Sequence, residues 1–222
     1  MIDVSENIIR ILEEIPPEVK LIPISKTKPD EMILSAWKDG FKVFGENKVQ
    51  DLSRKYENLP KDIEWHMVGH MQTNKVKYLA PFVHLIHGVD SFKLLKVMNK
   101  EALKADRVLN GLLQIHIAKE ETKFGFSEDE VRSILDSKEF WDLKNIRISG
   151  LMGMATNSRD VNQIRSEFGK LKKLQEDISR SYFSKGSGFG EVSMGMSGDY
   201  KIAIEEGSTM IRVGSLIFGS RN

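Results

Sequence analysis

Short apolar runs recur along the chain, and longer segments with helical spacing separate them. The runs that we expect as strands are 20–25, 42–45, 64–69, 83–89, 111–117, 146–154, 190–195 and 209–214. Most of them are almost continuously apolar, which is typical of parallel strands buried on both faces. The segments that we expect as helices are 30–39, 47–57, 73–80, 91–105, 127–138, 160–183 and 199–206. This repeated alternation predicts an α/β fold, a (β/α)8 barrel of the TIM type, over an open doubly wound sheet.

The N-terminal segment, residues 2–15, alternates charged and apolar residues at helical spacing, and we expect a helix there. It lacks the uninterrupted apolar stretch of a signal peptide. No run along the chain approaches the length needed to span a bilayer. No linker rich in Pro, Gly or Ser divides the sequence, so we expect a single domain over residues 1–222, with no membrane partner.

Charge and cysteine content narrow the classes of function. The chain has 33 Lys and Arg against 32 Asp and Glu, so no overall field favours nucleic acid as a partner. It contains no cysteine, which excludes disulfides, thiolate nucleophiles and cysteine metal sites and is compatible with a reducing compartment. We expect a cytoplasmic protein.

Lys26 comes directly after the first expected strand, in "LIPISKTKPD" at 21–30. Barrel enzymes carry their chemistry at the carboxyl ends of the strands. A lysine amine in a partly apolar barrel mouth can attack a carbonyl and form a Schiff base. Lys26 suits this role better than Lys28, which precedes Pro29 and is biased toward an extended loop. The alternative is a surface lysine whose stem reaches water, the commoner case for an arbitrary lysine.

Small hydroxyl-bearing residues mark the last two strand ends. Ser197 follows the seventh strand beside Gly198, and Gly214 and Ser215 follow the eighth at the start of a short apolar helix. Glycines, serine hydroxyls and helix-start N–H groups together can cradle a phosphate. In barrels, the seventh and eighth loops often form such a site. These residues are also ordinary in loops, so a purely structural role stays open.

Arg212 lies inside the apolar eighth strand. A bare buried arginine is prohibitively costly, so its guanidinium either meets a ligand or is paired. An ion pair with Glu206 or Asp199 is the structural alternative, and the sequence favours neither. The histidine pairs His66 with His70 and His84 with His87 fall on strand segments, where residues four or three apart do not share a helical face, and no metal site is expected from them.

Several segments together resemble the pyridoxal phosphate homeostasis proteins, small relatives of the N-terminal barrel of alanine racemase. The matching segments are "SKTKP" at 25–29, "FGENKVQ" at 44–50, "EWHMVGHMQTNK" at 64–75, "KFGF" at 123–126, "GLMGMA" at 150–155, "SMGMS" at 193–197 and "GSTMIRVGSLIFGSR" at 207–221. Their order and spacing carry the resemblance, since each alone is a weak signal.

The resemblance implies a barrel that binds pyridoxal 5'-phosphate as a Schiff base on Lys26. It also implies a phosphate held by Ser197, Gly214 and Ser215, and Arg212 facing the pyridine nitrogen. Asn47 and Met154 are implied to line the pocket, and Asn74 and Lys75 to lie in the third loop. Gly198 departs from the family, which commonly has an acidic residue there, and we expect a looser loop.

The resemblance implies a role in intracellular vitamin B6 homeostasis and delivery, without strong catalytic activity. Pyridoxal phosphate is then the ligand, with transient contacts to client enzymes and a monomeric chain. A low-activity amino-acid racemase is the alternative. We expect the chain to lack the extra β domain that supplies alanine racemase with its opposing tyrosine, and racemisation needs acid and base groups on both faces of the α-carbon. A third hypothesis is an aldolase-like lyase in which Lys26 attacks a sugar phosphate directly.

Overall fold

A computed structural model of the chain describes residues 2–120, 124–184, 186 and 188–219. The strands are β1 (Lys20–Pro23), β2 (Val43–Glu46), β3 (Glu64–Met67), β4 (Leu85–Val89), β5 (Leu109–Gln114), β6 (Ile146–Met152), β7 (Glu191–Ser193) and β8 (Met210–Val213). The helices are α1 (Val4–Glu14), α2 (Asp30–Lys38), α3 (Val49–Asn58), η1 (Thr73–Lys75), α4 (Val76–Leu79), α5 (Phe92–Lys104), α6 (Glu128–Asp136), α7 (Lys138–Trp141), α8 (Val161–Tyr182), α9 (Tyr200–Glu205) and α10 (Ser215–Phe218). Lys123 and residues 220 and 221, which belong to the matching segments, lie outside the described residues.

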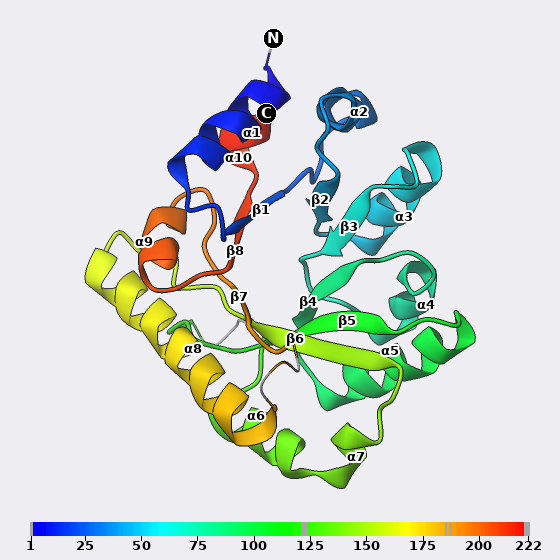
Figure 1. The fold of residues 1–222 in the computed structure, drawn as a ribbon, viewed down its shortest axis with the longest axis vertical. Helices are drawn as coiled ribbons and strands as arrows, with labels where there is room; N and C mark the ends of the chain where they lie inside the picture. Colours follow the sequence, from blue (N-terminus) through cyan, green and yellow to red (C-terminus); the bar gives the residue numbers. More distant parts are fainter. Residues whose placement is uncertain (1, 121–123, 185, 187, 220–222) are drawn as a thin grey trace.

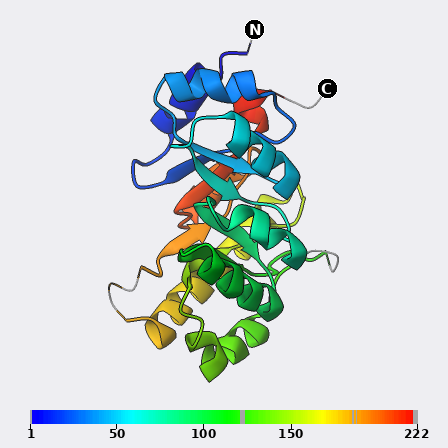
Figure 2. The same ribbon diagram turned by 90° about the vertical axis from the view of Figure 1, so that its right-hand side faces the viewer.

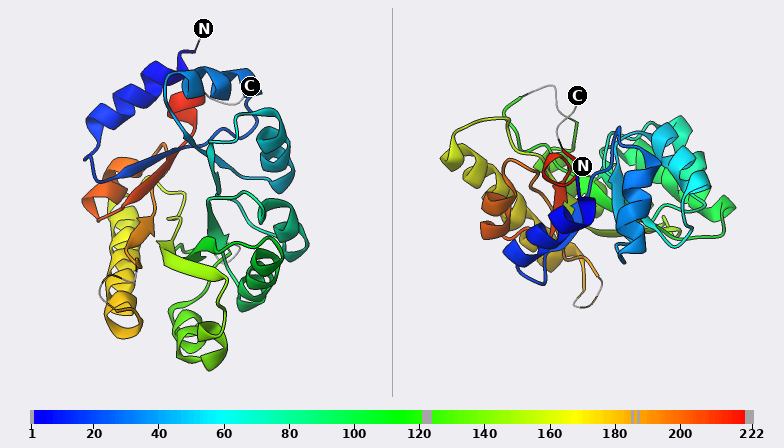
Figure 3. Two further views of the ribbon diagram at one scale, coloured as in Figure 1. Left: turned by 45° about the vertical axis from the view of Figure 1, so that its right-hand side comes forward. Right: turned by 90° about the horizontal axis from the view of Figure 1, so that it is seen from above.

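The strands form one parallel sheet that curls into a barrel. Their order is β1-β8-β7-β6-β5-β4-β3-β2, so β2 to β8 pair in the order of the sequence and β1 pairs with β8. Figures 1 and 3 show the helices packed around the outside of this ring. The predicted (β/α)8 barrel is therefore confirmed.

Successive strand residues alternate between two apolar clusters, as the period of a strand requires. The inner cluster consists of Ile22, Ile24, Leu85, Leu112, Met152 and Met210. The residues that follow them in sequence, such as Ile86, Leu113 and Ile211, belong to the larger cluster shared with the helices. The barrel is thus packed on both surfaces of its sheet, which explains why the strands lack a polar face.

The predicted helix at 127–138 is two helices. Ser127 opens α6 with a capping box, in which its hydroxyl accepts from the Glu130 N–H and the Glu130 side chain accepts from the Ser127 N–H. Ser137 then leaves the helical conformation, and its hydroxyl accepts from the Phe140 N–H to begin α7. Serine competes for backbone groups in this way, which hydrophobic spacing alone does not reveal.

The barrel closes between β1 and β2 through an isolated bridge, Ile24 to Gly45, rather than a ladder. The N–H groups of Lys20 and Ile24 donate to β8, whereas that of Ser25 donates to the Gly45 carbonyl at 2.9 Å. Amide groups alternate sides along a strand, so position 23 faces β2, and there Pro23 has no N–H to give. Gly45 permits the close approach, since a Cβ there would lie 2.6 Å from Ile24 Cδ1.

A buried ion pair reinforces this seam. Glu46, the last residue of β2, and Lys55 of α3 are both almost completely buried, with Nζ 2.5 Å from Oε1. The Lys55 ammonium also donates to the Ser25 carbonyl at 2.8 Å, and the Ser25 hydroxyl donates to Glu46 Oε1 at 2.7 Å. The end of β1 is therefore held to β2 and α3 by side chains where the backbone ladder is missing.

The loop between β7 and α9 contains two glycines with different constraints. Gly195 has φ +93°, and a Cβ there would lie 2.6 Å from Ala203 Cβ. Gly198 has open space around it and no positive φ. Asp199 fixes the loop by accepting from the Met196 N–H at 2.6 Å. The loop is thus held by Gly195 and Asp199, and position 198 accommodates a side chain.

Helix α1 packs beside α10 in the layer of helices outside the strands (Figures 1 and 2), where the Asn7 amide donates to the Ile217 carbonyl at 3.0 Å. This observed helix falls within the segment predicted at 2–15. No helix among the described residues combines the length and hydrophobicity that crossing a bilayer requires.

We predict that Lys55→Ala lowers the free energy of unfolding by about 3–5 kcal/mol, because it leaves the Glu46 carboxylate buried and unpaired. The measurement is urea denaturation. Lys42→Ala is the matched control, since it breaks an exposed pair with Asp62. The double variant Glu46→Gln with Lys55→Met should recover part of the loss, and equal effects of Lys55→Ala and Lys42→Ala would contradict the role of the seam.

We also predict that Gly195→Ala destabilises the chain by at least about 1 kcal/mol, because it combines a positive φ with a steric clash. Gly198→Ala should change stability by no more than about 1 kcal/mol, with stabilisation the expected direction. Thermal melting of the two variants side by side tests this contrast. A Gly198→Ala variant that melts lower than Gly195→Ala would refute it.

Candidate functional site

A pocket of about 300 Å³ lies at the carboxyl ends of the strands. All the site residues singled out from the sequence line it: Lys26, Asn47, Met154, Ser197, Arg212, Gly214 and Ser215. The remaining lining residues are Ile24, Lys28, Val68, Met196, Gly198 and Gly219. Six loops far apart in the sequence therefore contribute to one cavity at the end of the barrel where TIM barrels carry their sites.

Lys26 enters the pocket from a tight turn. The Lys28 N–H donates to the Ser25 carbonyl at 3.0 Å, and Thr27 lies in the left-handed region with φ +63°. A threonine there is strained by about 1–2 kcal/mol, so the surrounding contacts must impose the turn. They include the bonds from Lys55 and Glu46 to Ser25, directly before Lys26. The lysine is half-buried, and its backbone starts from one of the most firmly held points of the barrel.

Arg212 is 5% exposed, and its guanidinium is held by neutral groups. Nη1 donates to the Ser193 hydroxyl at 2.6 Å, and Nη2 donates to the Gly153 carbonyl at 3.1 Å. Burial lowers the pKa of Arg212 to about 10, against the opposing effect of the Asp199 charge. The side chain therefore remains charged at neutral pH and lines the pocket as a buried cation.

The structural alternative for Arg212, an ion pair, is not observed. Among the described residues, no carboxylate lies within ion-pair distance of its guanidinium, and Glu206 instead pairs with Arg165 at 2.7 Å. Asp199 contributes through its field alone and bonds the loop backbone. This arrangement leaves the positive charge available to a group in the pocket.

A chain of polar side chains runs from Arg212 through the interior of the barrel. The Ser193 hydroxyl lies 2.8 Å from His87 Nδ1, and His87 Nε2 lies 2.9 Å from His66 Nδ1. Burial lowers the pKa of His66 to about 3 and that of His87 well below its usual value. Both rings are consequently neutral at neutral pH. The sequence did not identify Ser193 and His87 as partners of the site, although each is a polar residue at an inward position of a buried strand.

The loops after β7 and β8 meet at one side of the pocket, where Ser197, Gly214 and Ser215 lie. The Gly214 N–H donates to the Ser197 hydroxyl at 3.3 Å. A Cβ on Gly214 would lie 3.2 Å from the Ile24 carbonyl, so glycine permits the two strands to approach closely. Helix α10 starts at Ser215, and the first N–H groups of a helix have no intrahelical partner. Backbone donors and a serine hydroxyl thus gather at one side of the cavity.

Asn74 and Lys75 lie in the third loop, as the resemblance implied. Both belong to η1 and are absent from the described pocket lining. Gly69 matters more, because a Cβ there would lie 2.2 Å from the carbonyl oxygen of Asn47. Only a glycine lets this loop pass the backbone of Asn47, which itself lines the pocket.

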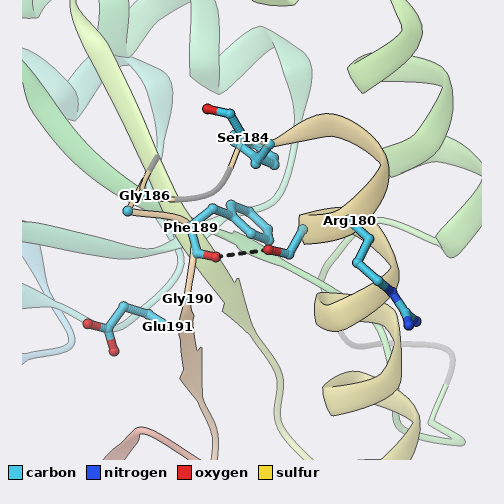
Figure 4. Close-up of a pocket in the computed structure, with 9 residues that line it drawn as sticks. Arg180, Ser184, Gly186, Phe189, Gly190 and Glu191 are labelled. Carbon is cyan, nitrogen blue, oxygen red and sulfur yellow. Dashed lines mark hydrogen bonds between the residues drawn. The ribbon is translucent and has the colours of Figure 1, made fainter.

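A second hollow lies beside the carboxyl end of α8 and the start of β7 (Figure 4). Arg180, Ser184, Gly186 and Glu191 are among its lining residues. The Ser179 hydroxyl there donates to the Phe189 carbonyl at 3.4 Å, so these polar atoms already satisfy each other. It lies at the amino end of β7, away from Lys26 and Arg212, and holds none of the site residues predicted from the sequence.

Comparison with known proteins identifies the family of the chain. The family model for the alanine racemase N-terminal domain matches residues 3–222. A pyridoxal phosphate homeostasis protein of Aquifex aeolicus is 39% identical over 203 residues, covering 91% of this chain and 87% of the relative. The structure of PipY from Synechococcus elongatus, solved without and with PLP bound, is 30% identical and covers 97% of this chain and 100% of that chain, with TM-scores of 0.89 and 0.87.

A more distant neighbour shows how far the fold extends. Alanine racemase from Bartonella henselae matches with a TM-score of 0.74 at 12% identity, covering 99% of this chain and 60% of that chain. At this identity the likeness concerns the barrel alone. The family model and the close relatives together show that the chain belongs to the alanine racemase N-terminal domain family, among the pyridoxal phosphate homeostasis proteins.

Proposed function

We propose that this chain binds pyridoxal 5'-phosphate reversibly in the pocket at the carboxyl ends of the strands, and that it stores and delivers the cofactor in the cytoplasm. One observation carries the proposal: a lysine amine, a buried arginine and a set of phosphate-type donors line the same cavity. The PLP-bound structure of the relative PipY supports the choice of ligand. Delivery implies transient contacts with client enzymes.

The residues present fit the chemical groups of the cofactor. Pyridoxal phosphate supplies an aldehyde, an electron-withdrawing ring and a phosphate dianion. Lys26 Nζ is the amine that would hold the aldehyde covalently. Ser197, Gly214 and Ser215 would bind the phosphate through a hydroxyl and backbone N–H groups, as helix starts do.

Arg212 would face the pyridine nitrogen. Its charge is buried and lacks a carboxylate partner among the described residues, which suits a hydrogen bond to a neutral ring nitrogen. A permanently protonated donor there keeps the ring nitrogen unprotonated and weakens the ring as an electron sink. Asn47 and Met154 would border the ring as pocket lining.

The pocket favours storage over catalysis. Among the lining residues that the structure describes, none is a Tyr, His, Asp or Glu that could face the lysine across a substrate carbon. Racemisation needs acid and base groups on both faces of that carbon. The names of the relatives agree with a homeostasis role. The racemase alternative would show itself as exchange of α-deuterium in amino acids above the rate with free cofactor.

We predict that borohydride treatment of the pyridoxal phosphate-loaded protein leaves a phosphopyridoxyl group on Lys26, identified by peptide mass spectrometry. Lys26→Ala should lose both the adduct and the visible absorbance. Lys28→Ala is the matched control, because Lys28 lines the same pocket two residues away. An adduct on Lys28, or one spread over surface lysines, would overturn the assignment. A colourless protein without any adduct would redirect the search to sugar phosphates.

We further predict that Ser193→Ala weakens binding of pyridoxal phosphate about 10-fold to 100-fold, because Arg212 loses a charge-assisted hydrogen bond worth about 1.5–3 kcal/mol. The absorbance of the bound cofactor should shift as well, which a merely structural role would not produce. Ser208→Ala is the control, since Ser208 is equally buried but bonds the carbonyls of Met194 and Met210. Equal affinities of the two variants would show that Ser193 does not position Arg212.

A further inference from the structure

Another cavity opens at the end of the barrel where the strands begin, opposite the pocket that Lys26 lines. Its volume is about 740 Å³, and its lining includes residues of β1, β3, β4 and β8. Three potential metal ligands gather in it, Glu64, His66 and His84. The proposed cofactor function uses none of them.

The cluster forms because two strands lie side by side. Glu64 and His66 are two residues apart on β3 and share a face of the sheet. His66 is paired with Leu85 of β4, and the His84 N–H donates to the Trp65 carbonyl at 2.9 Å. The histidine pairs noted in the sequence are thus separated, and His66 meets His84 across the strands.

The ligand atoms of the three side chains all lie within 4.8 Å of one another. His84 Nδ1 is 3.6 Å from Glu64 Oε2, and the rings of His66 and His84 lie 5.3 Å apart between centroids. Metal bonds of about 2.0–2.2 Å require a closer arrangement. Glu64 and His84 have exposed side chains, whereas His66 is buried and held by its bond to His87.

His66 has the features of an oriented ligand. It is 4% exposed, and its Nδ1 is bonded to His87 Nε2, whose ring is completely buried. Among the described residues its other nitrogen, Nε2, has no hydrogen-bond partner, and the side chain lines the cavity. Metal-binding histidines almost always use their second nitrogen on an orienting group in this way. A buried histidine that is oriented by His87 and lies with two further ligands in one cavity is the observation that distinguishes this cluster from an ordinary surface group.

The charge around the cluster does not oppose a cation. Lys20 and Arg147 also line the cavity, but Lys20 forms an ion pair with Glu191. The lining thus contains two bases, Lys20 and Arg147, and two acids, Glu64 and Glu191, whose charges sum to zero. A bound dication would therefore gain the Glu64 carboxylate without meeting a net positive surface.

We propose that Glu64, His66 and His84 bind a divalent transition-metal ion, with Zn²⁺ as the best match. Two imidazoles and one carboxylate are a common ligand set for this ion, and water fills the remaining position. The site lies at the end of the barrel away from Lys26, and its test does not require bound pyridoxal phosphate.

The test uses the full chain without a histidine tag and free of pyridoxal phosphate. Isothermal titration with Zn²⁺ should give one ion per chain, and Co²⁺ should develop the visible absorption of a low-symmetry site. His84→Ala and Glu64→Gln should each weaken Zn²⁺ binding by at least about 10-fold. Even mutation of a residue that only orients a metal ligand causes a loss of this size. Both side chains are exposed, so the variants are expected to fold, and their melting curves check this.

The matched control is His70→Ala. His70 forms an exposed pair with Asp90 at the other end of the barrel, at 2.7 Å, and resembles the cluster except for the third ligand. Zn²⁺ affinity should be unchanged in this variant. No binding by the unaltered chain, an unchanged affinity in both His84→Ala and Glu64→Gln, or an equal loss in His70→Ala would each overturn the site.

Discussion

The ion pair between Glu46 and Lys55 is the interaction on which the barrel and its pocket depend. A proline in β1 removes the backbone donor that a ladder to β2 would need, and the ring must still close there. The bridge between Ile24 and Gly45 closes it, and the pair reinforces the closure by joining the end of β1, the end of β2 and helix α3 in one buried network. Burying two charges is costly, and the cost is offset only because the geometry is close and further hydrogen bonds are made.

The position of this pair also explains why the pocket can hold a lysine firmly. The Ser25 carbonyl accepts a hydrogen bond from Lys55, and the Ser25 hydroxyl donates one to Glu46. Lys26 is the next residue. The strain of Thr27 is sustained by the same contacts. The same side chains therefore hold the β1–β2 seam together and fix the residue that precedes Lys26.

Much of the fold could be predicted from the sequence, because parallel strands and amphipathic helices leave strong patterns. Strand ends then identified the pocket lining, including Lys26 and Arg212, since barrel topology brings these ends together. Contacts between distant side chains could not be predicted. Lys55 resembles any helix lysine, and the environment of Arg212 left two roles open. Ser193 and His87 were missed because only the register of the strands shows that they meet.

The family shares a barrel down to 12% identity, so the fold alone does not determine the activity. The lining residues that the structure describes include lysines, an arginine and serines, but no Tyr, His, Asp or Glu. A site without such a second proton-transfer group suits the proposed carrier role. The same barrel can serve catalysis once another element supplies that group.

The hydrogen bonds that link Arg212, Ser193, His87 and His66 through the barrel all donate in one direction. Arg212 can only donate to the Ser193 hydroxyl, so the hydroxyl hydrogen points to His87, His87 donates to His66, and the His66 tautomer carries its hydrogen on Nε2. An ion bound at that nitrogen requires the opposite tautomers in both rings. The Ser193 hydrogen must then turn away from His87 toward another acceptor beside Arg212. If both proposed ligands bind, the two ends of the barrel would be thermodynamically linked, and each ligand would change the affinity for the other by the same factor.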